Sequence, residues 1–174
     1  MEPLKIIITG PVGAGKSTLI RTLSETEIVD TDAAASEDIG KAMTTVAMDY
    51  GTLRLGDQLL YLFGTPGQER FDFMWDVLTE GALGMLMLVR GDRPEDLGPA
   101  RRMLDYLLSQ HPVPHVVGVT RQDRPPVWGP EEVALFLGLP TERVVGLNAT
   151  DPKSAVQPLV RLLELMLAEE ESRP

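Results

Sequence analysis

The feature that most constrains the fold is residues 10–17, which have the sequence GPVGAGKS and satisfy the pattern G-x-x-x-x-G-K-[ST]. This pattern needs a buried strand before it and a helix after it. Residues 4–9 are a short β-branched run, and residues 16–26 place large aliphatic side chains on one face at helical spacing. The sequence therefore predicts a phosphate-binding loop within a strand–loop–helix unit.

Each residue type in this loop has a physical role. Glycines allow backbone N–H groups to close around a phosphate, and the N-terminus of the following helix adds a partial positive charge. Lys16 supplies a full positive charge, and Ser17 is placed to ligate Mg²⁺. The predicted nucleotide contacts of this loop are Gly10, Val12, Gly13, Ala14, Gly15, Lys16, Ser17 and Thr18.

Composition narrows the class of protein further. The chain has 174 residues, enough for one domain, which we place at 1–174. Its 26 acidic residues outnumber 16 basic ones, a balance that disfavours nucleic acid as a partner. There is no cysteine for a thiolate site or a lipid anchor, and the apolar run at 83–89 is far shorter than the roughly 20 residues of a membrane span. We expect a cytoplasmic protein without a stable membrane anchor.

The order of elements predicts the fold class. After an acidic loop at 26–41, strands are expected at 45–55 and 58–63 as an antiparallel pair joined by a Gly56-Asp57 turn. Further buried strands and helices then alternate, with strands at 83–89, 113–119 and 143–147 and helices at 97–108, 130–137 and 153–168. This alternation is typical of a three-layer α/β P-loop fold: a mainly parallel sheet of about six strands, one antiparallel edge strand, and helices on both faces.

The last helix is predicted in more detail. Asp151-Pro152 has the composition of a helix start. The residues expected on its core-facing stripe are Val156, Leu159, Val160, Leu163, Met166 and Leu167.

Residues 63–71, with the sequence FGTPGQERF, resemble the Ras-like small GTPases, whose second switch has the pattern D-x-x-G-Q-E. The runs TTVAMDYG at 44–51 and LFGTPGQ at 62–68 look more closely like the bacterial Ras-like GTPases of conserved multi-gene operons, relatives of the gliding-motility GTPases. This resemblance covers almost the whole chain. It implies a small G-domain fold, GTP and GDP as ligands, and Mg²⁺ as the metal.

The resemblance also implies catalytic roles. Gly67 contacts the γ-phosphate, Gln68 orients the attacking water, and Lys16 completes the catalytic set. Thr45 corresponds to the threonine that ligates Mg²⁺ together with Ser17, with Thr44 as the competing candidate. The alternatives are purely structural roles: Gln68 would be a turn-capping amide, and the two threonines would be ordinary strand residues.

The base-reading motif is only partly kept. The family has N-K-x-D after the fifth buried strand, where this chain has TRQD at 120–123, and a final S-A-K that falls at 148–150. The Asp123 carboxylate can accept hydrogen bonds from guanine N1 and N2, and the Ala149 N–H is placed to donate to guanine O6. The predicted base contacts are Thr120, Arg121, Asp123, Asn148, Ala149 and Thr150.

Other positions depart from the family pattern. Gly64 replaces the aspartate that normally holds Mg²⁺ through a water, so Mg²⁺ would rely on Ser17, Thr45, phosphates and waters. Val12 stands where many relatives have glycine, and a branched side chain there predicts slow intrinsic hydrolysis. Arg54 and Arg70 lie near the switches as candidates for an arginine finger, with a solvated surface role as the alternative for each.

Partners follow from the resemblance as well. It implies a roadblock-domain regulator or a GTPase-activating protein, and an effector bound through the switch regions. Apolar residues after Gln68 occupy the place of an effector surface, although a buried turn explains them equally well; they are Phe71, Phe73, Met74 and Trp75.

Three functions are compatible with these features. The first is a regulatory GTPase that hydrolyses GTP slowly unless a partner helps. The second is a nucleotide-binding scaffold without significant turnover, motivated by Val12 and Gly64. The third is a small-molecule P-loop kinase, because the run GPVGAGKST also looks like that of nucleotide kinases, although the chain lacks an arginine-rich lid.

Overall fold

The computed structural model describes residues 2–24, 49–65 and 72–173. A six-stranded sheet has the order β2-β3-β1-β4-β5-β6. Its strands are β1 (Leu4–Thr9), β2 (Asp49–Leu55), β3 (Gln58–Gly64), β4 (Gly84–Arg90), β5 (His115–Thr120) and β6 (Val144–Gly146). All neighbouring pairs are parallel except β2 and β3. The predicted fold class is therefore confirmed, including the single antiparallel edge strand.

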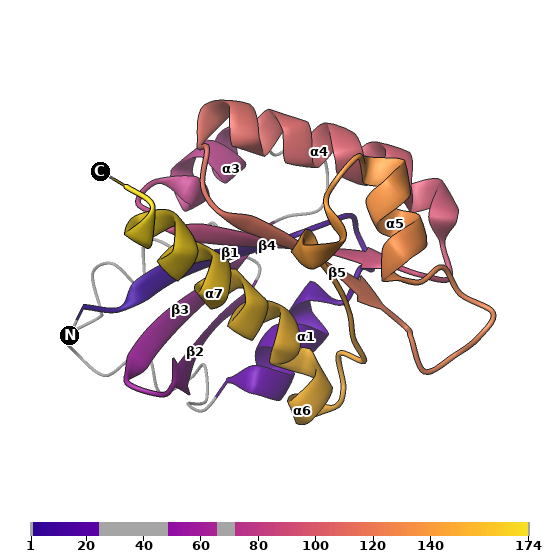
Figure 1. The fold of residues 1–174 in the computed structure, drawn as a ribbon, viewed down its shortest axis with the longest axis horizontal. Helices are drawn as coiled ribbons and strands as arrows, with labels where there is room; N and C mark the ends of the chain where they lie inside the picture. Colours follow the sequence, from indigo (N-terminus) through magenta and orange to yellow (C-terminus); the bar gives the residue numbers. More distant parts are fainter. Residues whose placement is uncertain (1, 25–48, 66–71, 174) are drawn as a thin grey trace.

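Helices cover both faces of the sheet (Figure 1). One face carries α3 (Asp72–Thr79), α4 (Leu97–Gln110) and α5 (Pro130–Leu137), with 3₁₀ turns at Pro94–Asp96 and Thr141–Arg143. The other face carries α1 (Lys16–Leu23), α6 (Pro152–Ala155) and α7 (Gln157–Glu171). Because both faces are covered, the inner strands are mostly apolar: Ile7 of β1 packs under α3, α4 and α5, while Ile6 and Ile8 pack under α1, α6 and α7.

The hairpin of β2 and β3 has the predicted two-residue turn. Leu55 pairs with Gln58 across Gly56 and Asp57, and Gly56 has a left-handed φ of 59°. The register then runs without a bulge to the pair Asp49 and Gly64 at the far end. This far end lies at the edge of the sheet where the phosphate loop leaves β1, since Gly64 pairs with Ile8 of that strand.

The prediction of one continuous C-terminal helix was wrong. Asp151 caps the start as expected, with its Oδ1 accepting a hydrogen bond from Lys153 N at 3.1 Å. The helix is interrupted at Val156, and α7 then begins with Pro158 in its first turn. A proline there has no N–H to bond back into α6, so the two segments are separate helices.

The predicted core stripe of this helix was also partly wrong. Leu159 and Leu162 are fully buried, whereas Val160 and Leu167 are 37% and 60% exposed. The apolar residues of α7 are so dense that helical spacing fits more than one stripe. Packing against the sheet sets the rotation of α7 about its own axis. The helical spacing of its apolar residues does not specify this rotation.

No helix among residues 2–24, 49–65 and 72–173 combines the length and apolar character needed to cross a membrane.

Candidate nucleotide-binding site

The phosphate loop follows β1, which has β3 on one side and β4 on the other, so the strand order of the sheet reverses at β1. Open α/β sheets bind ligands at such a point. Gly10 opens the loop with a φ of 142° and passes directly over β4. A Cβ at this position would lie 2.3 Å from the Leu88 carbonyl oxygen, so no other residue fits without moving backbone. Gly13 and Gly15 also have left-handed φ values of 81° and 106°. The glycines are therefore required by the path of the loop.

Lys16 is the charged group of this loop, and only 8% of it is exposed. Its Nζ donates hydrogen bonds to the carbonyl oxygens of Gly10 at 2.7 Å and Pro11 at 2.9 Å. Burial lowers the pKa of Lys16 to about 8, and the nearby Asp49 carboxylate opposes this shift. The ammonium group is thus held across the loop, at the edge of the cavity, by two backbone carbonyl oxygens.

A pH dependence follows from this environment. Phosphate oxygens beside Lys16 favour its charged form, so nucleotide binding should raise the pKa of Lys16 and take up a proton wherever the free protein has lost it. With a free pKa of about 8, we expect uptake to rise from about 0.2 proton at pH 7.5 to about 0.9 proton at pH 9. Calorimetric titration in buffers of different ionisation enthalpy measures this number. Uptake that is unchanged between the two pH values would contradict it.

A cavity of about 230 Å³ lies beside the loop. The Ser17 hydroxyl donates a hydrogen bond here to Oδ2 of Asp49, the first residue of β2. Hydroxyl and carboxylate oxygens are the hard donors that suit Mg²⁺, so this pair fits the metal that the sequence implies. The lining residues are Val12, Gly13, Gly15, Lys16, Ser17, Thr18, Asp49, Gly64, Thr65 and Arg121.

Asp49 was not among the predicted site residues. The sequence contained a signal for it, because a two-residue turn at 56–57 fixes the register of the hairpin and so places Asp49 opposite Gly64. Within the described ranges, no cluster of three or more acidic or histidine side chains is arranged to hold a metal. Mg²⁺ in nucleotide sites usually has one or two carboxylates as protein ligands and takes most of its other ligands from phosphates and waters.

A second cavity of about 110 Å³ adjoins the first. All six predicted base contacts line it, together with residues of the phosphate loop; the full set is Ala14, Gly15, Thr18, Thr120, Arg121, Asp123, Arg124, Asn148, Ala149 and Thr150. They come together because β5 and β6 are adjacent parallel strands that end at the same edge of the sheet as β1. Asp123 is exposed at this cleft, and Ala149 is buried.

Thr120 connects this second cavity, the candidate base cleft, to the phosphate loop, and the loops at 120–124 and 148–150 that line it are called the base loops. The side chain of Thr120 is buried, and its hydroxyl contacts the carbonyl oxygens of Ala14 at 3.4 Å and Val89 at 3.2 Å. The second base loop is held by Asn148, whose Oδ1 accepts hydrogen bonds from Thr150 N at 3.1 Å and Thr150 Oγ1 at 2.8 Å. Its own N–H donates to Ser154 Oγ of α6 at 2.8 Å. Both base loops are thus fixed by hydrogen bonds to their surroundings.

Several predicted residues lie outside the described part of the chain. These are Thr44, Thr45, Gly67, Gln68, Arg70 and Phe71, and the predictions made for them stay predictions. Arg54, predicted to lie near the switches, is on β2, but the switch segments lie outside the described residues, so its nearness to them stays a prediction. Arg54 is five residues from Asp49 along β2, or about 17 Å at the usual rise of a strand, and it lies toward the opposite edge of the sheet.

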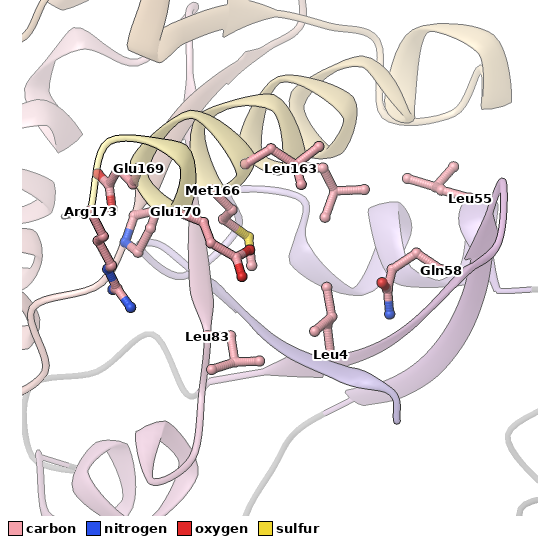
Figure 2. A pocket seen from close by; sticks show the side chains of 11 residues that line it. Leu4, Leu55, Gln58, Leu83, Leu163, Met166, Glu169, Glu170 and Arg173 are labelled. Atoms are coloured by element: carbon pink, nitrogen blue, oxygen red, sulfur yellow. The ribbon is translucent and has the colours of Figure 1, made fainter. Parts of the chain in front are cut away.

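A larger cavity, about 570 Å³, lies at that opposite edge (Figure 2). It is formed where α7 crosses the amino ends of the parallel strands, so it is remote from the phosphate loop. Aliphatic side chains line it, including Leu4, Leu55 and Leu163, and the charged groups of Glu169, Glu170 and Arg173 lie at the C-terminal end of α7. Its apolar lining does not suit a phosphorylated ligand.

The fold and the phosphate loop define a nucleotide-binding protein of the P-loop type. The chain belongs to the family described as conserved hypothetical ATP binding protein, whose model matches residues 26–169. It is also 30% identical over 128 residues to an uncharacterized protein of Methanocaldococcus jannaschii, a match that covers 70% of this chain and 72% of the relative. The family match begins after the phosphate loop, so it does not include residues 10–17.

Proposed function

We propose that this chain is a small Ras-like GTPase that acts as a regulatory switch, binding GTP or GDP with Mg²⁺ and hydrolysing GTP slowly. The observation that carries the proposal is Asp123 in a cleft that also contains Ala149 and the phosphate loop. The same cleft would hold the base while the adjoining cavity holds the phosphates. We further propose that residues 1–174 act as a single G domain in the cytoplasm.

The argument for guanine rests on the Asp123 carboxylate, which only accepts hydrogen bonds. Guanine presents two donors, N1–H and the N2 amino group, on the edge that would face Asp123. Adenine presents the N1 lone pair there, which a carboxylate repels. Two hydrogen bonds to a charged group contribute about 3–6 kcal/mol together, so we expect guanine to be favoured about 10²–10⁴-fold. The family description names ATP, which makes base specificity the property to measure.

The residues of the chain have distinct parts in the proposed reaction. Loop N–H groups bind the phosphate oxygens, and Lys16 exchanges its carbonyl partners for them. Gly67 would contact the γ-phosphate, and Gln68 would orient the attacking water. Mg²⁺, when bound, neutralises charge that develops on the phosphates. Binding of the γ-phosphate would order the switches and allow an effector to bind.

Slow hydrolysis is part of the proposal. Val12 is 63% exposed and lines the phosphate cavity, so its branched side chain occupies space that Gln68 or an incoming arginine would need. A partner such as a roadblock-domain regulator or another GTPase-activating protein would then supply the missing acceleration. The second candidate function is a nucleotide-dependent scaffold without turnover, which Val12 and the absence of a carboxylate at Gly64 favour.

The deciding experiment is calorimetric titration of nucleotide-stripped protein with GDP, a GTP analogue and an ATP analogue, each with and without Mg²⁺. Micromolar or tighter binding of the guanine nucleotides, with ATP about 100-fold weaker or more, is the expected result. Equal affinity for ATP would overturn the guanine assignment. It would also move the function to an ATPase or a small-molecule kinase.

Turnover distinguishes the switch from the scaffold. Single-turnover hydrolysis of GTP should be slower in Gln68→Leu than in the unmodified protein, because the leucine cannot orient water. Equal rates would remove the catalytic role of Gln68 and favour the scaffold.

A further inference from the structure

The phosphate cavity has an acidic side chain, but it belongs to a different strand from the one that the Ras-like pattern specifies. The last residue of β3 is Gly64, which has no side chain to offer. Asp49 lies directly across from it as its register partner on β2. A Cβ built at Gly64 would lie 3.5 Å from the Cβ of Asp49, so side chains from the two positions start side by side.

Asp49 is directed toward the phosphate loop. Its Oδ2 accepts the hydrogen bond from Ser17 Oγ, and its charge acts on Lys16 as well. Seven consecutive register pairs between β2 and β3 hold it there, so its position follows from the sheet. The carboxylate therefore faces the serine that the phosphate-loop pattern assigns to Mg²⁺.

The Asp49 carboxylate beside the phosphate cavity favours a cation there when a nucleotide is bound. A nucleotide in the cavity would bring its phosphates near the Asp49 carboxylate, and like charges at short range repel each other. A divalent cation between them replaces this repulsion with attraction to both. Mg²⁺ in nucleotide sites usually has one or two carboxylates, a few waters and phosphate oxygens as its partners. Among the described residues, Ser17 and Asp49 have side-chain oxygens placed for such a set.

We propose that Asp49 holds the nucleotide-bound Mg²⁺ in this chain and replaces the carboxylate that is missing at Gly64. The proposal rests on the proposed nucleotide-dependent function, because the metal arrives with a nucleotide. Under this proposal the effect of Asp49 on nucleotide affinity changes sign with the metal. Without Mg²⁺, Asp49 opposes nucleotide binding, and with Mg²⁺ it supports binding. Removing the Asp49 charge should therefore have opposite effects in the two conditions.

The test measures how fast a fluorescent GDP derivative dissociates in excess Mg²⁺ and in excess EDTA. In the unmodified protein Mg²⁺ should slow release strongly. In Asp49→Asn we expect the ratio of the two rates to shrink about tenfold or more, with release in EDTA no faster than in the unmodified protein. The control is Asp105→Asn, an exposed carboxylate on α4, which should leave the ratio unchanged. An unchanged ratio in Asp49→Asn, or faster release in both conditions, would overturn the proposal.

A second variant tests the position of the carboxylate. Adding Gly64→Asp to Asp49→Asn should restore part of the Mg²⁺ effect, because the new side chain starts at the same edge of the cavity. The nearest atom to its Cβ would be Ile20 Cδ1 at 3.2 Å, the end of a flexible side chain. A folded double variant that binds nucleotide in EDTA as Asp49→Asn does, yet regains no Mg²⁺ effect, would contradict a metal between these two strands.

The same measurements separate this proposal from the function on which it rests. If the unmodified protein binds a fluorescent ATP derivative and not the GDP one, the guanine assignment fails and the Asp49 test continues with ATP. If the unmodified protein binds GDP with no response to Mg²⁺, the guanine assignment stands and the Asp49 proposal fails.

Discussion

Replacing Asp123 with asparagine is expected to weaken GDP and GTP binding about 10²–10⁴-fold, because two hydrogen bonds to a charged acceptor are lost or reversed. The same change should improve binding of xanthosine nucleotides. Xanthine has a carbonyl oxygen where guanine has the N2 amino group, and an asparagine amide can donate to that oxygen. Titration calorimetry of the variant with GDP and with xanthosine diphosphate measures both effects.

Xanthosine diphosphate also serves as the internal control for folding. A variant that binds it has an intact phosphate loop and base cleft, so loss of GDP affinity can then be assigned to the base edge. GDP affinity equal to that of the unmodified protein would show that Asp123 does not read the base. Asp105→Asn, on the surface of α4, controls for the loss of one negative charge from this acidic chain.

Replacing Gly10 with alanine is expected to lower the free energy of unfolding by about 3–5 kcal/mol and to abolish nucleotide binding. Two effects combine at this position. The φ of 142° is strained for any residue with a Cβ, and that atom would lie 2.3 Å from the Leu88 carbonyl oxygen. Backbone of the central strand β4 cannot move away without disturbing its pairing with β1 and β5. Chemical denaturation with a two-state fit measures the loss.

Gly13→Ala separates these two effects. Gly13 also has a left-handed φ, of 81°, but a Cβ there would have nothing within 4 Å. We expect this variant to lose about 1–2 kcal/mol, the cost of the left-handed conformation alone. Equal losses in the two variants would mean that the close approach to β4 contributes little to the requirement for glycine at position 10.

Much of the fold could be predicted because its signals are local. The strand before the phosphate loop, the two-residue hairpin turn and the helix that starts at Pro130 each depend on a few neighbouring residues. The C-terminal helix was predicted less well, since its apolar residues fit more than one stripe and Pro158 divides it into two helices. Docking against the sheet decided which side was buried, and no short window of sequence contains that information.

In the candidate site too, features with local sequence signals could be predicted, and features that depend on pairing between strands could not. The predicted base contacts line one cleft because parallel strands that end in recognisable loops meet at the same edge of the sheet. Asp49 was missed because its place in the site depends on pairing across two strands. Arg54 lies at the hairpin end of β2, away from Asp49, and the direction of the strand that puts it there was not part of the sequence argument.

The pairing of Asp49 with Gly64 has a consequence for comparing sequences of such proteins. Across a tight hairpin, two alignment columns far apart along the chain correspond to one location in space. An acidic group can disappear from one column and arise in the other while the charge of the molecule at that location stays the same. A column-by-column comparison would record a lost ligand and an unrelated gain. Columns joined by strand register should therefore be scored as a pair before a chain is classed as inactive.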